Sequence, residues 1–160
     1  MKSVVIMQIV AVLTAFTIGC SHHSHNAHHD HHAGEAKLEL NDGKKWETDE
    51  SLRKGMTEVK RIVTVNLQKV REGRTSAKEY SDIANQVNDQ IQFLIKNCKL
   101  PADADAQLHT LIAQMIGAAH KMKGPSSISE KQKGFFEVVN AVNEYGDYFH
   151  HPQWTKVDHK

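Results

Sequence analysis

The sequence predicts an all-α protein, an up-down-up-down antiparallel four-helix bundle preceded by a disordered, histidine-rich tether. Three observations lead to this fold class. Apolar residues recur at helical spacing in four segments of about 20 residues, only a few residues connect these segments, and no segment alternates as a strand does. We expect residues 1–19 to be a signal peptide, residues 20–37 the tether and residues 38–160 one bundle domain.

The first twenty residues have the pattern of an export signal. Lys2 supplies a positive charge, and the uncharged run Val4–Ile18 that follows is too short for a comfortable transmembrane helix. The sequence Thr17-Ile18-Gly19-Cys20 resembles the lipobox of bacterial lipoproteins. This resemblance implies cleavage before Cys20, a lipid anchor on that residue and a place in the bacterial cell envelope, facing the periplasm. Ser21, rather than an aspartate, then indicates the outer membrane; an ordinary secretory signal is the alternative.

Histidine is concentrated directly after this signal, where seven of the twelve histidines fall within eleven residues. They are His22, His23, His25, His28, His29, His31 and His32. Almost no apolar side chain is present to offset the entropy of ordering, so we expect disorder. Neutral imidazoles on a flexible chain can converge on one divalent transition metal, and Asp30 adds a carboxylate. Copper, zinc or nickel is therefore the expected ligand. A solvated spacer that binds no metal is the alternative.

The composition argues against two classes of function. Twenty Lys and Arg stand against nineteen Asp and Glu, and removal of Lys2 with the signal makes the numbers equal. Because no excess positive charge is left to neutralise phosphates, we expect no nucleic-acid partner. The sequence contains no phosphate-binding glycine loop, Cys-x-x-Cys, His-Glu-x-x-His or nucleophile-elbow motif, so we do not expect an enzyme.

The bundle begins with an irregular segment and two helices. Residues 38–46 contain turn residues at Asn41-Asp42-Gly43 and are too short for a sheet, so we expect them to cover an edge of the domain. The first helix is predicted over residues 49–72, with Thr48 or Asp49 as its cap, and the second over 76–98, opened by a capping box from Ser76 to Glu79. The apolar stripe of the first helix consists of Leu52, Met56, Val59, Val63 and Val70. That of the second consists of Tyr80, Ile83, Val87, Ile91, Leu94 and Cys98.

Two more helices complete the prediction. The third covers residues 102–123 and closes at Gly124-Pro125; the fourth covers 127–150 and ends before Pro152. The apolar stripe of the third helix consists of Ala104, Leu108, Leu111, Met115, Ala118 and Met122. That of the fourth consists of Phe135, Val138, Val142, Tyr145 and Phe149. Cys98 is expected to pack as a small hydrophobic residue, and His109 and His120 to lie on the surface.

One short motif suggests a second function. The spacing Leu52-x-x-x-Met56 early in the first helix of an exported four-helix bundle resembles the small periplasmic cytochrome b family. That resemblance implies haem held by Met56 and by a histidine late in the fourth helix, and hence electron transfer. Alignment on Asn143-x-Tyr145 places Gly146 where the family has this histidine, and His150, one turn further on, is the candidate in its place.

Three functional hypotheses therefore remain. In the first, a cell-envelope lipoprotein binds or buffers divalent transition metal through its tether. In the second, the bundle carries haem. In the third, the protein is a structural or partner-binding lipoprotein of the envelope. The sequence does not indicate a protein partner.

Overall fold

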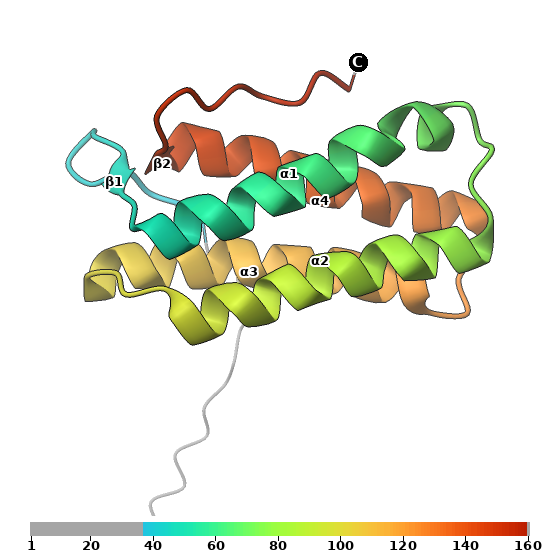
Figure 1. Ribbon diagram of the computed structural model, residues 1–160, viewed down its shortest axis with the longest axis horizontal. Helices are drawn as coiled ribbons and strands as arrows, with labels where there is room; N and C mark the ends of the chain where they lie inside the picture. The colour runs from blue at the N-terminus through green and yellow to red at the C-terminus, as the bar shows by residue number, and fades with distance from the viewer. Residues whose placement is uncertain (1–36, 160) are drawn as a thin grey trace, which may run out of the picture. The chain divides into compact units, whose positions relative to one another are not determined.

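Four helices form a bundle in the computed structural model, which describes residues 37–159 (Figure 1). They are α1 (Glu50–Arg71), α2 (Ala77–Asn97), α3 (Ala102–Lys123) and α4 (Ile128–Tyr148). The predicted all-α class and the four helices are confirmed, with bounds that differ from the prediction by at most two residues. The signal peptide, Cys20 and the seven histidines between His22 and His32 lie outside the described residues.

Three of the helices begin at a side chain that accepts a backbone hydrogen bond. Asp49 caps α1, because its Oδ1 accepts a hydrogen bond from the Leu52 N–H at 2.6 Å. Of the two predicted caps, Thr48 and Asp49, the second is therefore the one that forms. The predicted capping box at the start of α2 is present, with Ser76 and Glu79 each accepting the other's backbone N–H. Ser127 caps α4. These caps satisfy N–H groups that a helix leaves unpaired at its start.

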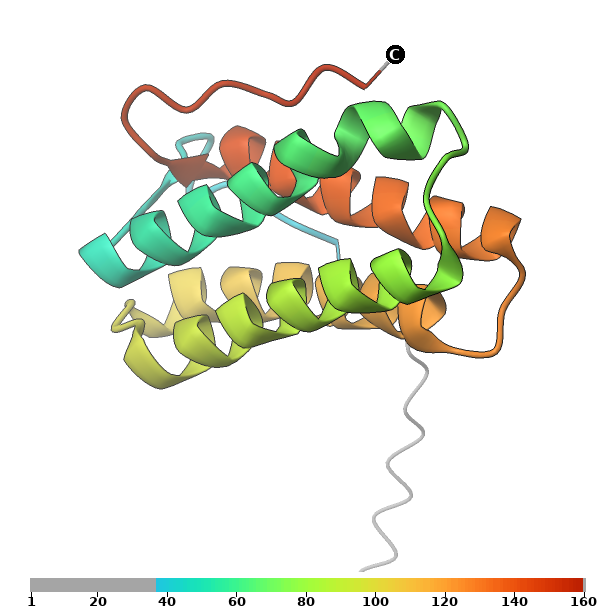
Figure 2. The ribbon, with the colours of Figure 1, turned by 45° about the vertical axis from the view of Figure 1, so that its right-hand side comes forward.

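The apolar stripes meet in one core. Helix α1 lies against α2, α2 against α3, and α3 against α4, and α1 also contacts α4 (Figure 2). The largest fully buried side chains include Tyr80, Phe135, Tyr145 and Phe149. Within residues 37–159 no helix is both long and apolar enough to cross a membrane.

The end of α3 is held by a buried lysine from the next helix. Lys131, in α4, is only 4 % exposed, and its ammonium group donates hydrogen bonds to the carbonyls of Met122 and Gly124 at 2.8 and 2.5 Å. The last carbonyls of a helix have no partner inside it, and a positive charge there also favours the helix dipole. The charge of Lys131 is thus stabilised by the helix end that it caps.

The predicted end of the fourth helix is wrong by two residues, and a small sheet follows. Phe149–His150 forms strand β2, which pairs in parallel with β1 (Trp46–Glu47) in the register Trp46 to Phe149. Sequence analysis expected no sheet. Pro152 already prevents the helix from continuing, and the extended backbone finds partners in the segment before α1.

Candidate functional site

The two residues predicted to hold haem differ in their exposure to solvent. Met56 is completely buried in the core. The ring of His150 lies at the surface, where Nδ1 is 3.3 Å from Oε2 of Glu47, and its carbonyl accepts a hydrogen bond from the Thr48 hydroxyl. Neither Met56 nor His150 lines either of the two best-formed cavities of the described residues. No described feature therefore favours a haem slot beside these residues.

The residues after α4 form an aromatic cluster at this end of the bundle. We call residues 149–159 the strap; it turns back and runs along α4 and α1 (Figure 1). The indole of Trp154 packs against Gly146: a Cβ atom at Gly146 would lie 2.4 Å from Trp154 Cδ1. This contact explains why a residue without a side chain stands at the position that the cytochrome resemblance gives to a histidine.

His151 lies in the middle of this cluster. Its Nδ1 is 3.0 Å from the hydroxyl of Tyr145, and its ring centre is 4.7 Å from that of Trp154. Burial lowers the pKa of His151, and the positive charges of Arg53 and Lys60 lower it further. Sequence reasoning missed this cluster, because it joins residues of α1, α4 and the strap without any recognisable spacing. The only signal in the sequence is the presence of Tyr145, His151 and Trp154 within ten residues around the end of a helix.

The one cysteine among the described residues is expected to be unreactive. Cys98 packs against the core and is partly exposed. Burial, followed by the negative charges of Asp49 and Asp105, raises its pKa to about 12. Because the thiolate is the reactive form, Cys98 is a poor nucleophile near neutral pH. This agrees with its predicted role as a packing residue.

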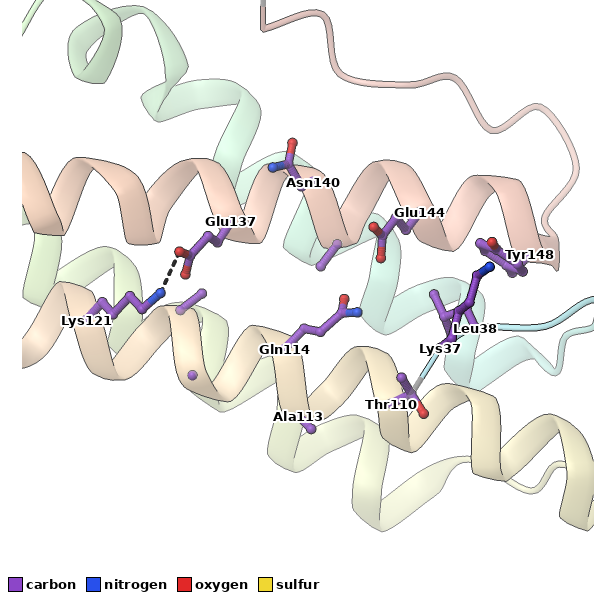
Figure 3. Close-up of a pocket in the computed structure, with 13 residues that line it drawn as sticks. Lys37, Leu38, Thr110, Ala113, Gln114, Lys121, Glu137, Asn140, Glu144 and Tyr148 are labelled. Atoms are coloured by element: carbon purple, nitrogen blue, oxygen red, sulfur yellow. Dashed lines mark hydrogen bonds and ion pairs between the residues drawn. The ribbon is translucent and has the colours of Figure 1, made fainter. Parts of the chain in front are cut away.

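A groove of about 840 Å³ runs between α3 and α4 (Figure 3). At one end Lys121 and Glu137 form an ion pair at 2.5 Å. Further along, Gln114 and Glu144 extend into the gap from opposite helices. Two lysines and two glutamates are among its lining residues, so their charges cancel. The groove therefore has no net charge that would select an anion or a metal ion.

The surface histidines of α3 do not form a metal site with each other. His109 and His120 are both exposed, as predicted, and His109 Nδ1 lies 3.3 Å from a carboxylate oxygen of Asp105. Between residues 37 and 159, no three or more His, Cys, Asp or Glu side chains are grouped so that they could hold a metal ion. The predicted metal ligands of the tether stand outside this part of the chain and stay a prediction.

No protein-family model matches this chain, and no curated protein or solved structure matches it either. The assignment of function therefore depends on the chain's own residues. Two features stand out: the histidines that follow Cys20, and the cluster around His151.

Proposed function

We propose that this protein is a bacterial cell-envelope lipoprotein that binds or buffers divalent transition metal through its histidine-rich tether. The observation that carries the proposal is the position of seven imidazoles within eleven residues, directly after a lipobox-like cysteine. Imidazole is a ligand of copper, zinc and nickel. A lipid on Cys20 would hold these ligands at the membrane surface, facing the periplasm.

The spacing of the histidines favours exchangeable binding. Ser24, the pair Asn26-Ala27 and Asp30 interrupt the histidines at irregular intervals, so no fixed geometry is imposed on the metal. Intrinsic affinity then follows the usual divalent series, in which copper(II) exceeds nickel and zinc. A site of this kind gives up its metal to a competing ligand, which is the property of a buffer rather than of a structural metal centre.

The bundle is the folded body that the tether anchors. We propose for it the up-down-up-down antiparallel topology. Connections of a few residues and contacts between each helix and the next along the chain support this order.

Metal titration of two variants tests the proposal. Changing all seven tether histidines to serine preserves the length of the chain and removes the proposed ligands. The matched control changes the exposed His109 and His120 to serine. Calorimetric titration of the detergent-extracted protein with copper, zinc and nickel at pH 7.5 should show binding in the wild type and the control, and its loss in the tether variant. Metal affinity that survives in the tether variant would overturn the proposal.

The anchor is tested separately. Mass spectrometry of protein from the native envelope should show an N-terminal, lipid-modified Cys20. Cys20→Ala should abolish the modification and leave the protein unprocessed or released from the membrane. An unmodified N-terminus at another residue would contradict lipidation while leaving metal binding by the tether intact.

A further inference from the structure

The far end of the strap is tied to α4. Val157 is buried, and both of its backbone groups bond to Asn143: its N–H donates to Oδ1 at 2.8 Å and its carbonyl accepts from Nδ2 at 3.0 Å. Lys156 forms an ion pair with Asp147 at 2.7 Å. An amide that pairs with both groups of one residue fixes that residue's position. The strap is therefore seated along the helix and does not trail from it.

The strap is also tied to α1, through a lysine. The ammonium group of Lys60 donates hydrogen bonds to the hydroxyl oxygen and the carbonyl of Thr155, and it lies 4.7 Å from the ring centre of Trp154. Cation–π contacts and charge-assisted hydrogen bonds of this kind stabilise the seated strap. They also place a permanent positive charge beside the aromatic cluster.

The two charged groups that act on the pKa of His151 are both positive. From α1, Arg53 and Lys60 act on it, and both disfavour a positive charge on its ring. From α4 it meets the hydroxyl of Tyr145, which keeps its proton because burial raises the pKa of Tyr145. The nearby carboxylate of Glu47 is paired with His150, and Asp49 acts on Tyr145 and Cys98.

One buried group weakens the packing of the strap against α1 and α4. The indole N–H of Trp154 is buried and has no hydrogen-bond partner among the described residues. A buried donor without a partner destabilises the conformation that buries it. The free-energy difference between the seated and the released strap is therefore smaller than the contacts of the strap alone suggest. One added charge can then shift the equilibrium between these two states.

We propose that the strap is an acid-sensitive latch, which is seated on α1 and α4 while His151 is neutral and released when His151 takes up a proton. The neutral ring can accept a hydrogen bond from Tyr145 at Nδ1. The protonated ring carries hydrogen on both nitrogens, so Nδ1 can then only donate to the Tyr145 hydroxyl, and the ring brings a third positive charge beside Arg53 and Lys60. Release exposes Gly146 and the face of α4 that Trp154 covers.

The direction of the pH effect follows from linkage. The pKa of His151 in the seated state lies below that of a free histidine, so the released state binds the proton more tightly. Above the ordinary histidine pKa of about 6.5 both states are neutral and the latch is at full strength. As the pH falls from there through the lowered pKa, the equilibrium shifts toward the released strap, by at most about tenfold for each unit by which the pKa is lowered.

Hydrogen exchange of the full chain between pH 7.5 and 5.0 tests the latch. After correction for intrinsic exchange rates, we expect residues 153–158 to lose protection as the pH falls, while far-UV circular dichroism shows that the helices persist. His151→Gln, which cannot be protonated in this range, should stay protected at pH 5. His150→Asn, a change at the exposed neighbouring histidine, should behave as the wild type.

Two outcomes would overturn the latch: wild-type protection that is unchanged down to pH 5, or a His151→Gln variant that loses protection over the same pH range. If this variant is unprotected at every pH, an NMR titration of the unmodified protein decides. A His151 pKa below 6.5 supports the latch, and a value at or above 6.5 refutes it. None of these readouts depends on the metal bound by the tether, so the latch and the proposed function fail or succeed independently.

Discussion

At the scale of single residues, the absence of a side chain at Gly146 decides where the largest residue of the strap lies. The Cδ1 and Nε1 atoms of Trp154 would come within 2.4 and 2.6 Å of a Cβ atom there. Real Cβ atoms essentially never approach other atoms so closely. The glycine is thus required by packing, although it stands inside a helix, where glycine is otherwise unfavourable.

A matched pair of glycine variants tests this explanation. Gly146→Ala should displace Trp154 and lower the free energy of unfolding by about 1–3 kcal/mol, the usual effect of overpacking. Gly117→Ala, in α3, places its Cβ in open space and should be neutral or raise stability by up to about 1 kcal/mol. Urea denaturation measures both. Equal effects of the two changes would show that the indole moves aside at no cost.

Cys98 provides a second test at this scale. Its raised pKa of about 12, compared with an ordinary 9.0, lowers the thiolate fraction at pH 8. Alkylation by iodoacetamide should therefore be roughly ten- to a hundredfold slower than for an unfolded cysteine, since the thiolate is the attacking form. The Cys20→Ala variant leaves Cys98 as the sole thiol. Unfolding in urea should restore the fast rate; a fast rate in the folded protein would mean that the thiol is not desolvated.

At the scale of elements, each helix depends on groups that complete its ends. Local side chains cap the starts of α1, α2 and α4, whereas the end of α3 depends on Lys131 from the following helix. A helix end that receives its partner from another helix ties the stability of one to the packing of the other. The α3–α4 pair therefore behaves as a unit, in contrast to a helix that is capped by its own residues.

Replacing Lys131 by methionine measures this dependence. The change preserves the length of the side chain but leaves the carbonyls of Met122 and Gly124 without their donor. We expect the free energy of unfolding to fall by about 1–3 kcal/mol. Lys133→Met is the control: Lys133 is exposed and only paired with Glu130 at the surface, so its loss should cost less than about 1 kcal/mol. A Lys131 variant as stable as this control would contradict the capping role.

At the scale of the whole molecule, the proposed metal ligands and the folded core lie in different parts of the chain. The proposed ligands are residues 22–32, and the core is built from residues 38–157. A ligand stabilises a fold only when it binds the folded state in preference to the unfolded one. Imidazoles of a segment without a core of its own should bind metal equally in both states.

This division predicts how metal and pH act together. Saturating copper or zinc should leave the melting temperature of the bundle nearly unchanged. Metal affinity should fall as the pH drops toward 5, because protons compete for imidazoles with an ordinary pKa of about 6.5. Calorimetry and melting curves of the full chain and of a chain without residues 21–36 measure both effects. Undiminished affinity or a large rise in melting temperature in the shorter chain would move the site into the bundle, with Met56 and His150 the first residues to change.

The four helices could be predicted from the sequence because their signals are local. Capping residues such as Ser76, breakers such as Pro152 and an apolar stripe every three or four residues are all contained within one segment. The pairing of β1 with β2, the capping of α3 by Lys131 and the packing of the strap against Gly146 depend instead on how the helices pack. These features join residues that are separated along the chain, where backbone and polar groups take whichever partners the packed helices bring near. His151 belongs to this second kind: its lowered pKa comes from Arg53 and Lys60, which lie about a hundred residues earlier in the chain and meet it only when α1 packs beside α4.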